Sequence, residues 1–375
     1  MTDNVLTRRD FLKKTGQAAL AISGGLTLEA LLDGCAGAPI FESAKDVANI
    51  KWDANPAIPV PKEGCYAGWH RDLTTLGEGD FIQLFNTERV RLFEEDLIDS
   101  YIKDYGQGPA VHSFSDRNIT GGFFPSKFCE GAYNKGVIPL IRFYYKQDFK
   151  NVAKGAYDKT LVKFAQGAKA FGKPFFFVPY PEVNITDTYE APHPWAGSGR
   201  SGGKWFQSAW ERMHTIFERE GANDYAVWGL HLIGIDVGQP FSWFAVDKDL
   251  VDWVGFTEYN LEGQSGGLNR SLSQLFRLQN DYWWARQNYP QKPIAFWEFG
   301  SSDTSNQGKW IENAYKTIKE NLPRVKLVVY AEYPTFGSGL LGGSYESTVI
   351  TNRAKPSYKE AISNAYFIGS KQRRS

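Results

Sequence analysis

Residues 173–184 read KPFFFVPYPEVN and contain the pattern on which the fold prediction rests. A short apolar run ends in a proline-rich turn, and this turn carries the carboxylate of Glu182. Residues 292–300, KPIAFWEFG, repeat the arrangement, with Glu298 directly after the apolar run. Short apolar runs bounded by turn residues are typical of buried strands. Each of these two predicted strands therefore delivers an acidic side chain at its carboxyl end.

The same theme extends along the chain from residue 65. Stretches whose apolar residues recur every three or four positions predict amphipathic helices at 157–171, 204–220 and 309–322. They alternate with eight predicted strands, at 66–69, 110–114, 138–144, 174–179, 225–232, 253–256, 294–297 and 327–330. This alternation predicts an α/β fold, a (β/α)8 TIM barrel in a single domain.

A doubly wound open sheet is the alternative architecture. It should carry a glycine-rich phosphate-binding turn directly after its first strand. Residues 65–73, CYAGWHRDL, contain no such turn, so we favour the barrel. In barrel enzymes the catalytic groups lie where the strands end and the following loops begin, and Glu182 and Glu298 occupy such positions.

Composition narrows the class of function. The 375 residues carry 42 basic and 42 acidic side chains, so the chain has no overall attraction for nucleic acid. Twelve tryptophans exceed what a core requires, and an indole face suits the C–H face of a sugar ring. The three cysteines argue against a disulfide scaffold, and the five histidines have no metal-ligand spacing. We therefore expect no metal and no organic cofactor.

The N-terminus resembles an export signal. Residues 7–14, TRRDFLKK, match the twin-arginine type, and the apolar stretch at 18–26 is too short for a membrane-spanning anchor. Residues 32–35, LDGC, resemble a lipoprotein cleavage box, so Cys35 is the predicted lipidation site. These features predict twin-arginine export to the periplasm or cell surface and attachment to a membrane through a lipid on Cys35. A basic amphipathic first helix is the alternative.

Three segments follow from these boundaries. Residues 1–35 form the predicted export signal with its lipobox-like end, and residues 36–62, which lack a clear period, form a predicted tether. Residues 63–370 form the predicted barrel domain.

Paired carboxylates at the mouth of one barrel are the minimum equipment for glycoside hydrolysis. One acts as general acid and the other as nucleophile or base. A carboxylate at the end of an apolar strand is partly desolvated, and its neighbours tune its ionisation. The alternative is that Glu182 and Glu298 each pair with a Lys or Arg in an ion network. Their joint placement on the fourth and seventh strands favours catalysis.

Several segments, taken in order, resemble glycoside hydrolase family 26, a retaining family with the barrel fold. The resemblance covers roughly residues 65–345 and rests on residues 155–158, GAYD, on Glu182 with Asn184 followed by Trp195, on residues 209–212, AWER, on Trp243 with residues 251–259, and on residues 292–300. It implies that Glu182 is the acid/base and Glu298 the nucleophile. It further implies a hydrolase that cleaves a β-linked polysaccharide, a β-mannan or another β-glycan, by endo action.

The resemblance also implies roles for neighbouring residues. Asn184 would hold Glu182 or a sugar hydroxyl, and Tyr259 would hydrogen-bond Glu298 and keep it ionised. The tryptophans expected to line sugar subsites, with core packing as the alternative, are Trp69, Trp195, Trp243 and Trp297. Apart from the resemblance, His70 and Asp116 lie at the ends of the first two predicted strands and are further candidates for sugar contacts.

Three positions depart from the family pattern. Pro181 stands where the family usually has His, Val178 where it usually has Arg, and Thr257 where mannan-cleaving members often have Asp. The departures weigh against mannan as the substrate. They also keep open a non-catalytic carbohydrate-binding protein on a degenerate barrel. A transglycosylase would use the same residues and differ only in its acceptor.

Overall fold

The computed structural model describes residues 44–71, 87–116, 122–143, 148–185, 198–234, 238–260, 271–272, 281–302, 305–333, 336–338, 344–345 and 347–370. The predicted export signal, including Cys35, lies outside these residues. None of the described helices is both long and apolar enough to cross a bilayer.

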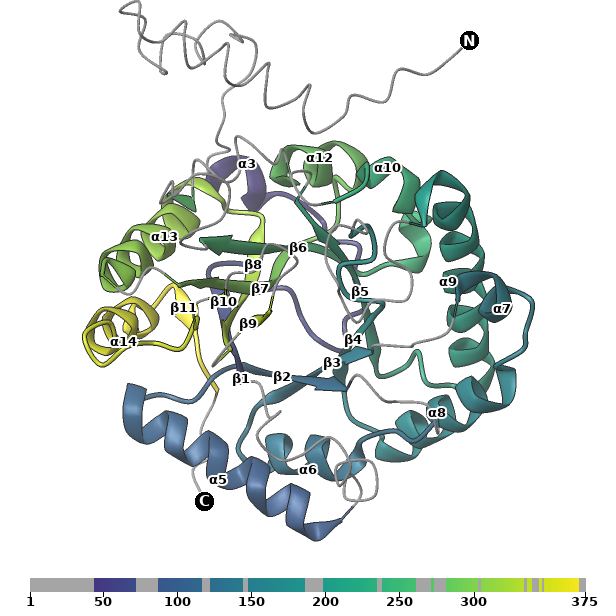
Figure 1. Ribbon diagram of the computed structural model, residues 1–375, viewed down its shortest axis with the longest axis horizontal. Coiled ribbons are helices and arrows are strands. Elements are labelled where there is room, and N and C mark those ends of the chain that lie inside the picture. Colours follow the sequence, from purple (N-terminus) through teal and green to yellow (C-terminus); the bar gives the residue numbers. More distant parts are fainter. Residues whose placement is uncertain are drawn as a thin grey trace, which may run out of the picture. The chain divides into compact units, whose positions relative to one another are not determined.

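Parallel strands close into a barrel that is surrounded by helices (Figure 1). The barrel strands are β1 (Cys65–Arg71), β2 (Val111–Asp116), β3 (Ile138–Phe143), β4 (Phe175–Pro179), β5 (Ala226–Ile233), β6 (Trp253–Asn260), β7 (Ile294–Ser301) and β8 (Val325–Glu332). Pairing of β8 with β1, from Tyr66↔Leu327 to Arg71↔Glu332, closes the ring. The (β/α)8 prediction and its eight strands are confirmed.

The helices lie outside the ring. Their bounds are α3 (Ala44–Ala48), α5 (Glu88–Tyr105), α6 (Ser126–Asn134), α7 (Phe149–Ala153), α8 (Asp158–Phe171), α9 (Gly199–Glu220), α10 (Phe241–Phe244), α12 (Asp281–Asn288), α13 (Gln307–Asn321) and α14 (Lys355–Ser363). The three helices expected from periodicity are α8, α9 and α13, and α9 begins earlier than predicted. Short strands are β9 (Phe336–Ser338), β10 (Ser344–Tyr345) and β11 (Phe367–Ile368), the last of which pairs with the start of β1.

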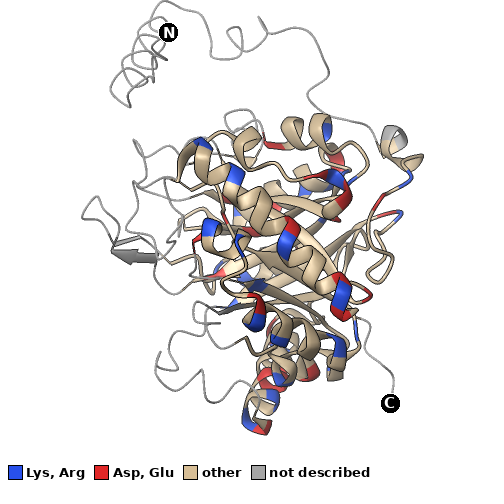
Figure 2. Ribbon diagram, turned by 90° about the vertical axis from the view of Figure 1, so that its right-hand side faces the viewer, with Lys and Arg blue, Asp and Glu red and all other residues tan. Residues whose placement is uncertain are grey.

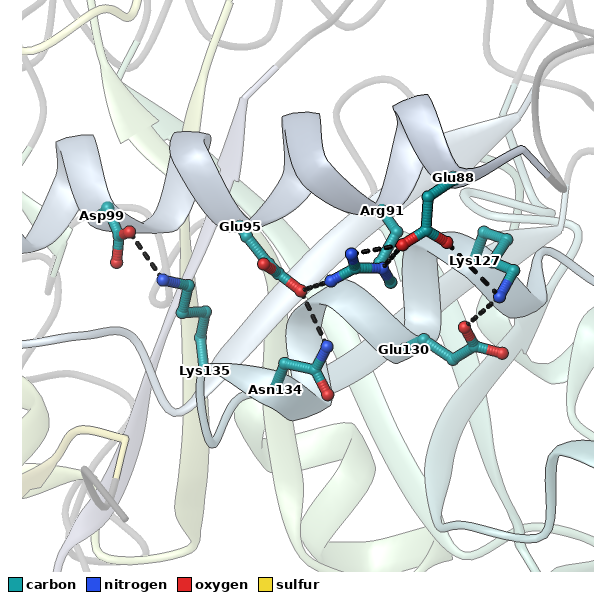
Figure 3. Close-up of polar contacts among 8 residues, drawn as sticks. All are labelled: Glu88, Arg91, Glu95, Asp99, Lys127, Glu130, Asn134 and Lys135. Atoms are coloured by element: carbon teal, nitrogen blue, oxygen red, sulfur yellow. Dashed lines mark hydrogen bonds and ion pairs between the residues drawn. The ribbon is translucent and has the colours of Figure 1, made fainter. Parts of the chain in front are cut away.

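Basic and acidic residues are interspersed on the outer helices (Figure 2). Between α5 and α6 they form a network in which Arg91 contacts Glu88 and Glu95, while Lys135 reaches Asp99 at 2.6 Å (Figure 3). Pairs at the surface contribute little to stability, because water screens them and long side chains lose freedom, and the pairs here are partly or fully exposed. The network therefore joins two surface helices without fixing the barrel.

Apolar side chains fill the barrel interior. The buried cluster there includes Val111, Leu140, Phe176, Val178, Val227, Trp253, Ala295, Trp297, Leu327 and Val329. Trp297 fits because two neighbouring strands carry glycine beside it. A Cβ at Gly229 would lie 2.5 Å from the Trp297 ring, and a Cβ at Gly255 would lie 2.7 Å from its Nε1. The absence of side chains at Gly229 and Gly255 thus makes room for the large indole in the core.

Residues 51–62 pack against the amino end of the barrel. Ile58 is 1% exposed and belongs to the interior cluster, together with Val111 at the start of β2. The backbone N–H of Asn55 donates to Asp252, just before β6, at 2.7 Å. The predicted tether is therefore wrong over this part, because residues 51–62 belong to the barrel domain.

Replacing Ile58 by Ala tests this assignment. A core residue should cost about 2–5 kcal/mol in the free energy of unfolding, since the substitution leaves a cavity. Leu92→Ala, at a position that is 49% exposed on α5, is the matched control and should change stability by no more than about 0.5 kcal/mol. Denaturant unfolding measures both. Equal, small effects would restore the tether.

Candidate active site

The turn after β4 holds Glu182 in an unusual backbone conformation. Tyr180 and Glu182 both have positive φ, 53° and 54°, on either side of Pro181. Non-glycine residues in this region cost about 1–3 kcal/mol each, and such strain gathers at functional sites. Backbone hydrogen bonds fix the turn: Tyr180 donates to Phe143 at 3.0 Å, and Val183 donates to His231 at 3.2 Å. The neighbouring strands thus hold the Glu182 backbone in place.

Asn184 secures the same turn from behind. Its Nδ2 donates to the carbonyl oxygens of Ile233 and Gln239, both at 2.9 Å, and its Oδ1 accepts from the Ile233 N–H at 2.8 Å. The side chain is fully buried. This corrects the expectation that Asn184 touches Glu182 or a sugar. It ties the Glu182 turn to the segment that follows β5.

A β-bulge in β7 turns Glu298 toward the barrel interior. Phe256 of β6 pairs with Phe296, but the next residue, Thr257, pairs with Glu298, so Trp297 is an extra residue in the ladder. The pairing of β7 with β8 also shifts between Phe296 and Phe299. In a regular strand Trp297 and Glu298 would face opposite sides. The bulge lets Trp297 fill the core while Glu298 also faces inward.

Three side chains converge on the Glu298 carboxylate. The Arg142 guanidinium from β3 contacts Oε1. Oε2 accepts hydrogen bonds from the hydroxyl groups of Tyr259, at 2.7 Å, and Tyr333, at 3.3 Å. Arg142 also donates to the Tyr333 hydroxyl at 2.9 Å. The predicted hydrogen bond from Tyr259 is confirmed. All these contacts favour the ionised form of Glu298.

Sequence reasoning missed Arg142, although it stands out as a charged residue within the apolar run at 138–144. In the sheet it lies directly beside Val178 of β4, the position where the resembled family has Arg. The guanidinium missing from β4 is therefore supplied at the same level by the neighbouring strand. Arg142 is fully buried and Glu298 is 4% exposed, so the pair is shielded from water.

Glu182 and Glu298 face one another across the mouth. One carboxylate oxygen of each, together with a ring nitrogen of His231, lies within 4.8 Å of the others. Glu182 Oε1 accepts a hydrogen bond from Thr257 Oγ1 at 2.6 Å, and Thr257 Oγ1 lies 2.8 Å from His231 Nε2. Two carboxylates with different partners and a small separation are suited to divided acid and nucleophile roles.

The same three groups have the residue types of a metal site. Their existing partners argue against a cation. Glu298 already contacts the positive guanidinium of Arg142, and the Nε2 atom of His231 is engaged by Thr257. A divalent ion would have to displace these contacts and lie beside a fixed positive charge. The arrangement suits proton transfer better than metal binding.

Two of the predicted subsite tryptophans are core residues. Trp69 is 2% exposed, stacks on His112 and donates its Nε1 hydrogen to Glu332 at 2.8 Å. Trp297 is fully buried, and its Nε1 donates to the Leu230 carbonyl oxygen at 3.0 Å. Indole rings suit cores and sugar platforms equally well, so residue type alone gave the wrong assignment.

The other residues predicted to contact sugar lie in different environments. Trp243 is half-buried on α10, whereas Trp195 lies outside the described residues. His70 is buried, its Nδ1 lies 2.9 Å from the Ser113 carbonyl oxygen, and its ring lies 5.1 Å from that of Tyr333. At 2% exposure His70 has little surface to offer a sugar. Asp116 is the last residue of β2, and its side chain lies outside the part of the chain that the structure describes.

Comparison with known proteins supports the fold. The chain matches no protein-family profile. It resembles a ruminal GH26 endo-β-1,4-mannanase with a TM-score of 0.56, at 14% identity over 89% of this chain and 72% of that one. For a GH26 endo-β-1,4-mannanase of Bacillus sp. JAMB-750 the values are 0.56, 13%, 82% and 88%, and for a Cellulomonas fimi endo-β-1,4-mannanase 0.55, 15%, 82% and 72%. The fold is the barrel of these enzymes.

A sequence relative comes from Acetivibrio thermocellus. Its endoglucanase H is 27% identical over 214 residues. The aligned part is 54% of this chain, and it spans only 22% of that much longer protein.

Removing Arg142 tests the buried pair. Arg142→Met leaves Glu298 buried without its cation and should cost about 3–5 kcal/mol in the free energy of unfolding. Arg91→Met, in the exposed network of α5, is the control and should lose far less. Chemical denaturation measures both variants. Equal losses would show that the buried Arg142–Glu298 pair contributes no more to the free energy of unfolding than a surface pair.

Proposed function

We propose that this protein is a retaining glycoside hydrolase that cleaves a β-linked polysaccharide. The observation that carries the proposal is the separation of the carboxylates: oxygens of Glu182 and Glu298 lie within 4.8 Å of one another. Retaining glycosidases hold their carboxyl groups about 5–5.5 Å apart, while inverting enzymes leave about 6.5–9.5 Å for a water molecule. The short separation favours double displacement.

In this mechanism Glu298 attacks the anomeric carbon while Glu182 gives its proton to the departing glycosidic oxygen. The resulting glycosyl-enzyme is hydrolysed by a water molecule whose proton Glu182 accepts. Arg142, Tyr259 and Tyr333 stabilise the negative charge of Glu298 and fix its orientation before attack. Glu182 Oε1 accepts a hydrogen bond from the Thr257 hydroxyl, a neutral donor that can hold either the acid or the carboxylate.

We assign the substrate to the β-glycans and propose endo action. The similar proteins support this class, since they are named as endo-β-1,4-mannanases and as an endoglucanase. Thr257 and Pro181 replace the Asp and His of the resembled family, which argues against mannan itself. A transglycosylase would use the same two glutamates and pass the glycosyl group to a sugar acceptor.

A non-catalytic carbohydrate-binding protein is the second candidate. It was supported by the absence of Arg at 178 and of His at 181. The contact of Arg142 with Glu298 restores a guanidinium at the first of these positions. Only the change at 181 still favours the binding protein, so catalysis is the better-supported function.

Substitution of the two glutamates separates these functions. Glu298→Ala should abolish turnover of β-glycans and leave their binding nearly intact. Glu182→Ala should reduce cleavage of the polysaccharide by about 10²–10⁴-fold but spare aryl glycosides with good leaving groups, which need little protonation. Glu130→Ala on the surface of α6 is the control. The proton NMR spectrum of the first product should show the β anomer. An initial α anomer would exclude retention, and turnover unaffected by either substitution would favour the binding protein.

We also propose twin-arginine export and lipid attachment at Cys35. Stable attachment needs the several acyl chains of a mature lipoprotein, because one chain binds a membrane only weakly. Cys35→Ala should therefore move the protein from the membrane fraction to the soluble fraction with its fold unchanged. Cys129→Ala, at a buried free thiol, should leave the distribution unaltered. Wild-type protein found wholly in the soluble periplasmic fraction would contradict the anchor, and export after Arg8 and Arg9 are both changed to Lys would contradict the twin-arginine route.

A further inference from the structure

Thr257 connects Glu182 to His231 in the barrel mouth. Its hydroxyl lies 2.6 Å from Glu182 Oε1 and 2.8 Å from His231 Nε2. His231 is fully buried on β5 and Thr257 is 5% exposed on β6, so the contact between them is protected from water, while the contact with the half-buried Glu182 is partly so. Buried hydrogen bonds to a carboxyl group are strong and fix its orientation.

A hydroxyl group has one hydrogen atom, and this limits the hydrogen bonds that Thr257 can make. If it donates to Glu182 Oε1, it must accept from His231, which then carries its hydrogen on Nε2. In that arrangement Oε1 is an acceptor, so the proton of the neutral carboxylic acid resides on Oε2. In the opposite arrangement the acid proton would lie on Oε1 and point at Thr257, where no leaving group can receive it.

We propose that His231 and Thr257 are positioning residues that keep the acid proton of Glu182 on Oε2, the oxygen that Thr257 does not hold and that is therefore left to protonate the leaving group. This rests on the proposed hydrolase function and gives a role to two residues outside the pair of glutamates. His231, as the Nε2–H tautomer, orients the Thr257 hydroxyl, and Thr257 holds Oε1. The same bond serves the second step, because a carboxylate accepts it at least as well as the acid does.

The position of Thr257 on β6 supports the role. Side chains two residues apart on a strand face the same side, so Thr257 and Tyr259 both face the mouth. Thr257 contacts Glu182 and Tyr259 contacts Glu298. One strand thus holds both carboxylates, each through a hydroxyl donor. The contacts from β6 therefore help to fix the position of the two glutamates relative to one another.

Thr257→Val and Thr257→Ser test the proposal by activity. Valine has the shape of threonine without its hydroxyl and should lower kcat/KM on a polysaccharide by about 10- to 100-fold, the loss expected for a hydrogen bond to a carboxyl group that gains charge in the transition state. Aryl glycosides with good leaving groups should lose less than about threefold in the glycosylation step. Serine keeps the hydroxyl and should restore most of the activity. Equal losses on both substrates, or no rescue by serine, would overturn the role in acid catalysis.

The pH profile gives a second readout. Glu182 is faced by Glu298 from β7 and by His231 from β5, and Glu298 in turn contacts Arg142 and Tyr259. These groups stay in place in Thr257→Val, so a change in the profile reports the lost bond. Its removal disfavours the carboxylate, and the alkaline limb of kcat/KM should move to higher pH in the valine variant and stay in place in the serine variant. An unmoved limb would indicate a purely structural role.

A nitrogen-15 NMR measurement tests the chain of hydrogen bonds without any turnover. The protein has five histidines, and the signal of His231 is identified by its loss in His231→Gln. We expect the Nε2–H tautomer at neutral pH. The Nδ1–H tautomer would overturn the proposal even in an active enzyme. Conversely, a wild-type protein that cleaves no glycan but shows the Nε2–H tautomer would refute the proposed hydrolase while the hydrogen-bond chain stands.

Discussion

The contact between Arg142 and Glu298 places two opposite charges where almost no water reaches them. Moving such groups out of water costs several kcal/mol for each ion, and their attraction offsets the cost only when the remaining polar atoms are also paired. The barrel meets this requirement with Tyr259 and Tyr333, which donate to the second carboxylate oxygen. The four partners come from β3, β6, β7 and the end of β8. Closure of the ring is therefore a condition for the site, since no pair of adjacent strands brings these groups together.

The acid side of the site is built differently. Glu182 lies on a strained turn and not within a strand, and the strain is sustained by backbone bonds to β3 and β5 and by the buried amide of Asn184. A rigid strand holds the nucleophile candidate and a tied turn holds the acid candidate. The two carboxyl groups thus differ in the side chains that contact them as well as in backbone support. The proposed mechanism needs such a difference, because one carboxyl group must be ionised while the other carries a proton.

Local patterns in the sequence predicted the eight strands, three of the helices and the placement of both glutamates at strand ends, whereas the bond from Tyr259 followed from the resemblance to glycoside hydrolase family 26. They succeeded where a short segment decides the outcome. Arg142 was missed because its role depends on the register of β3 against β4, which places it beside Val178. Trp69 and Trp297 were assigned to sugar subsites because residue type alone does not distinguish a core tryptophan from one that contacts a sugar. Ile58 was placed in a tether because residues 51–62, which pack against the amino end of the barrel, have neither helical nor strand periodicity.

The bulge in β7 decides which side of the sheet the Glu298 side chain faces. In a strand without it, the side of the sheet on which a residue stands follows from counting, and Trp297 and Glu298 compete for the interior. With one residue inserted, both face inward, and every later position of the strand reverses its parity relative to the earlier ones. If Trp297 instead paired with Thr257 in a regular ladder, Glu298 would face the outer helices. The direction of the carboxylate therefore depends on the register of β7 against β6, which a list of side chains does not reveal.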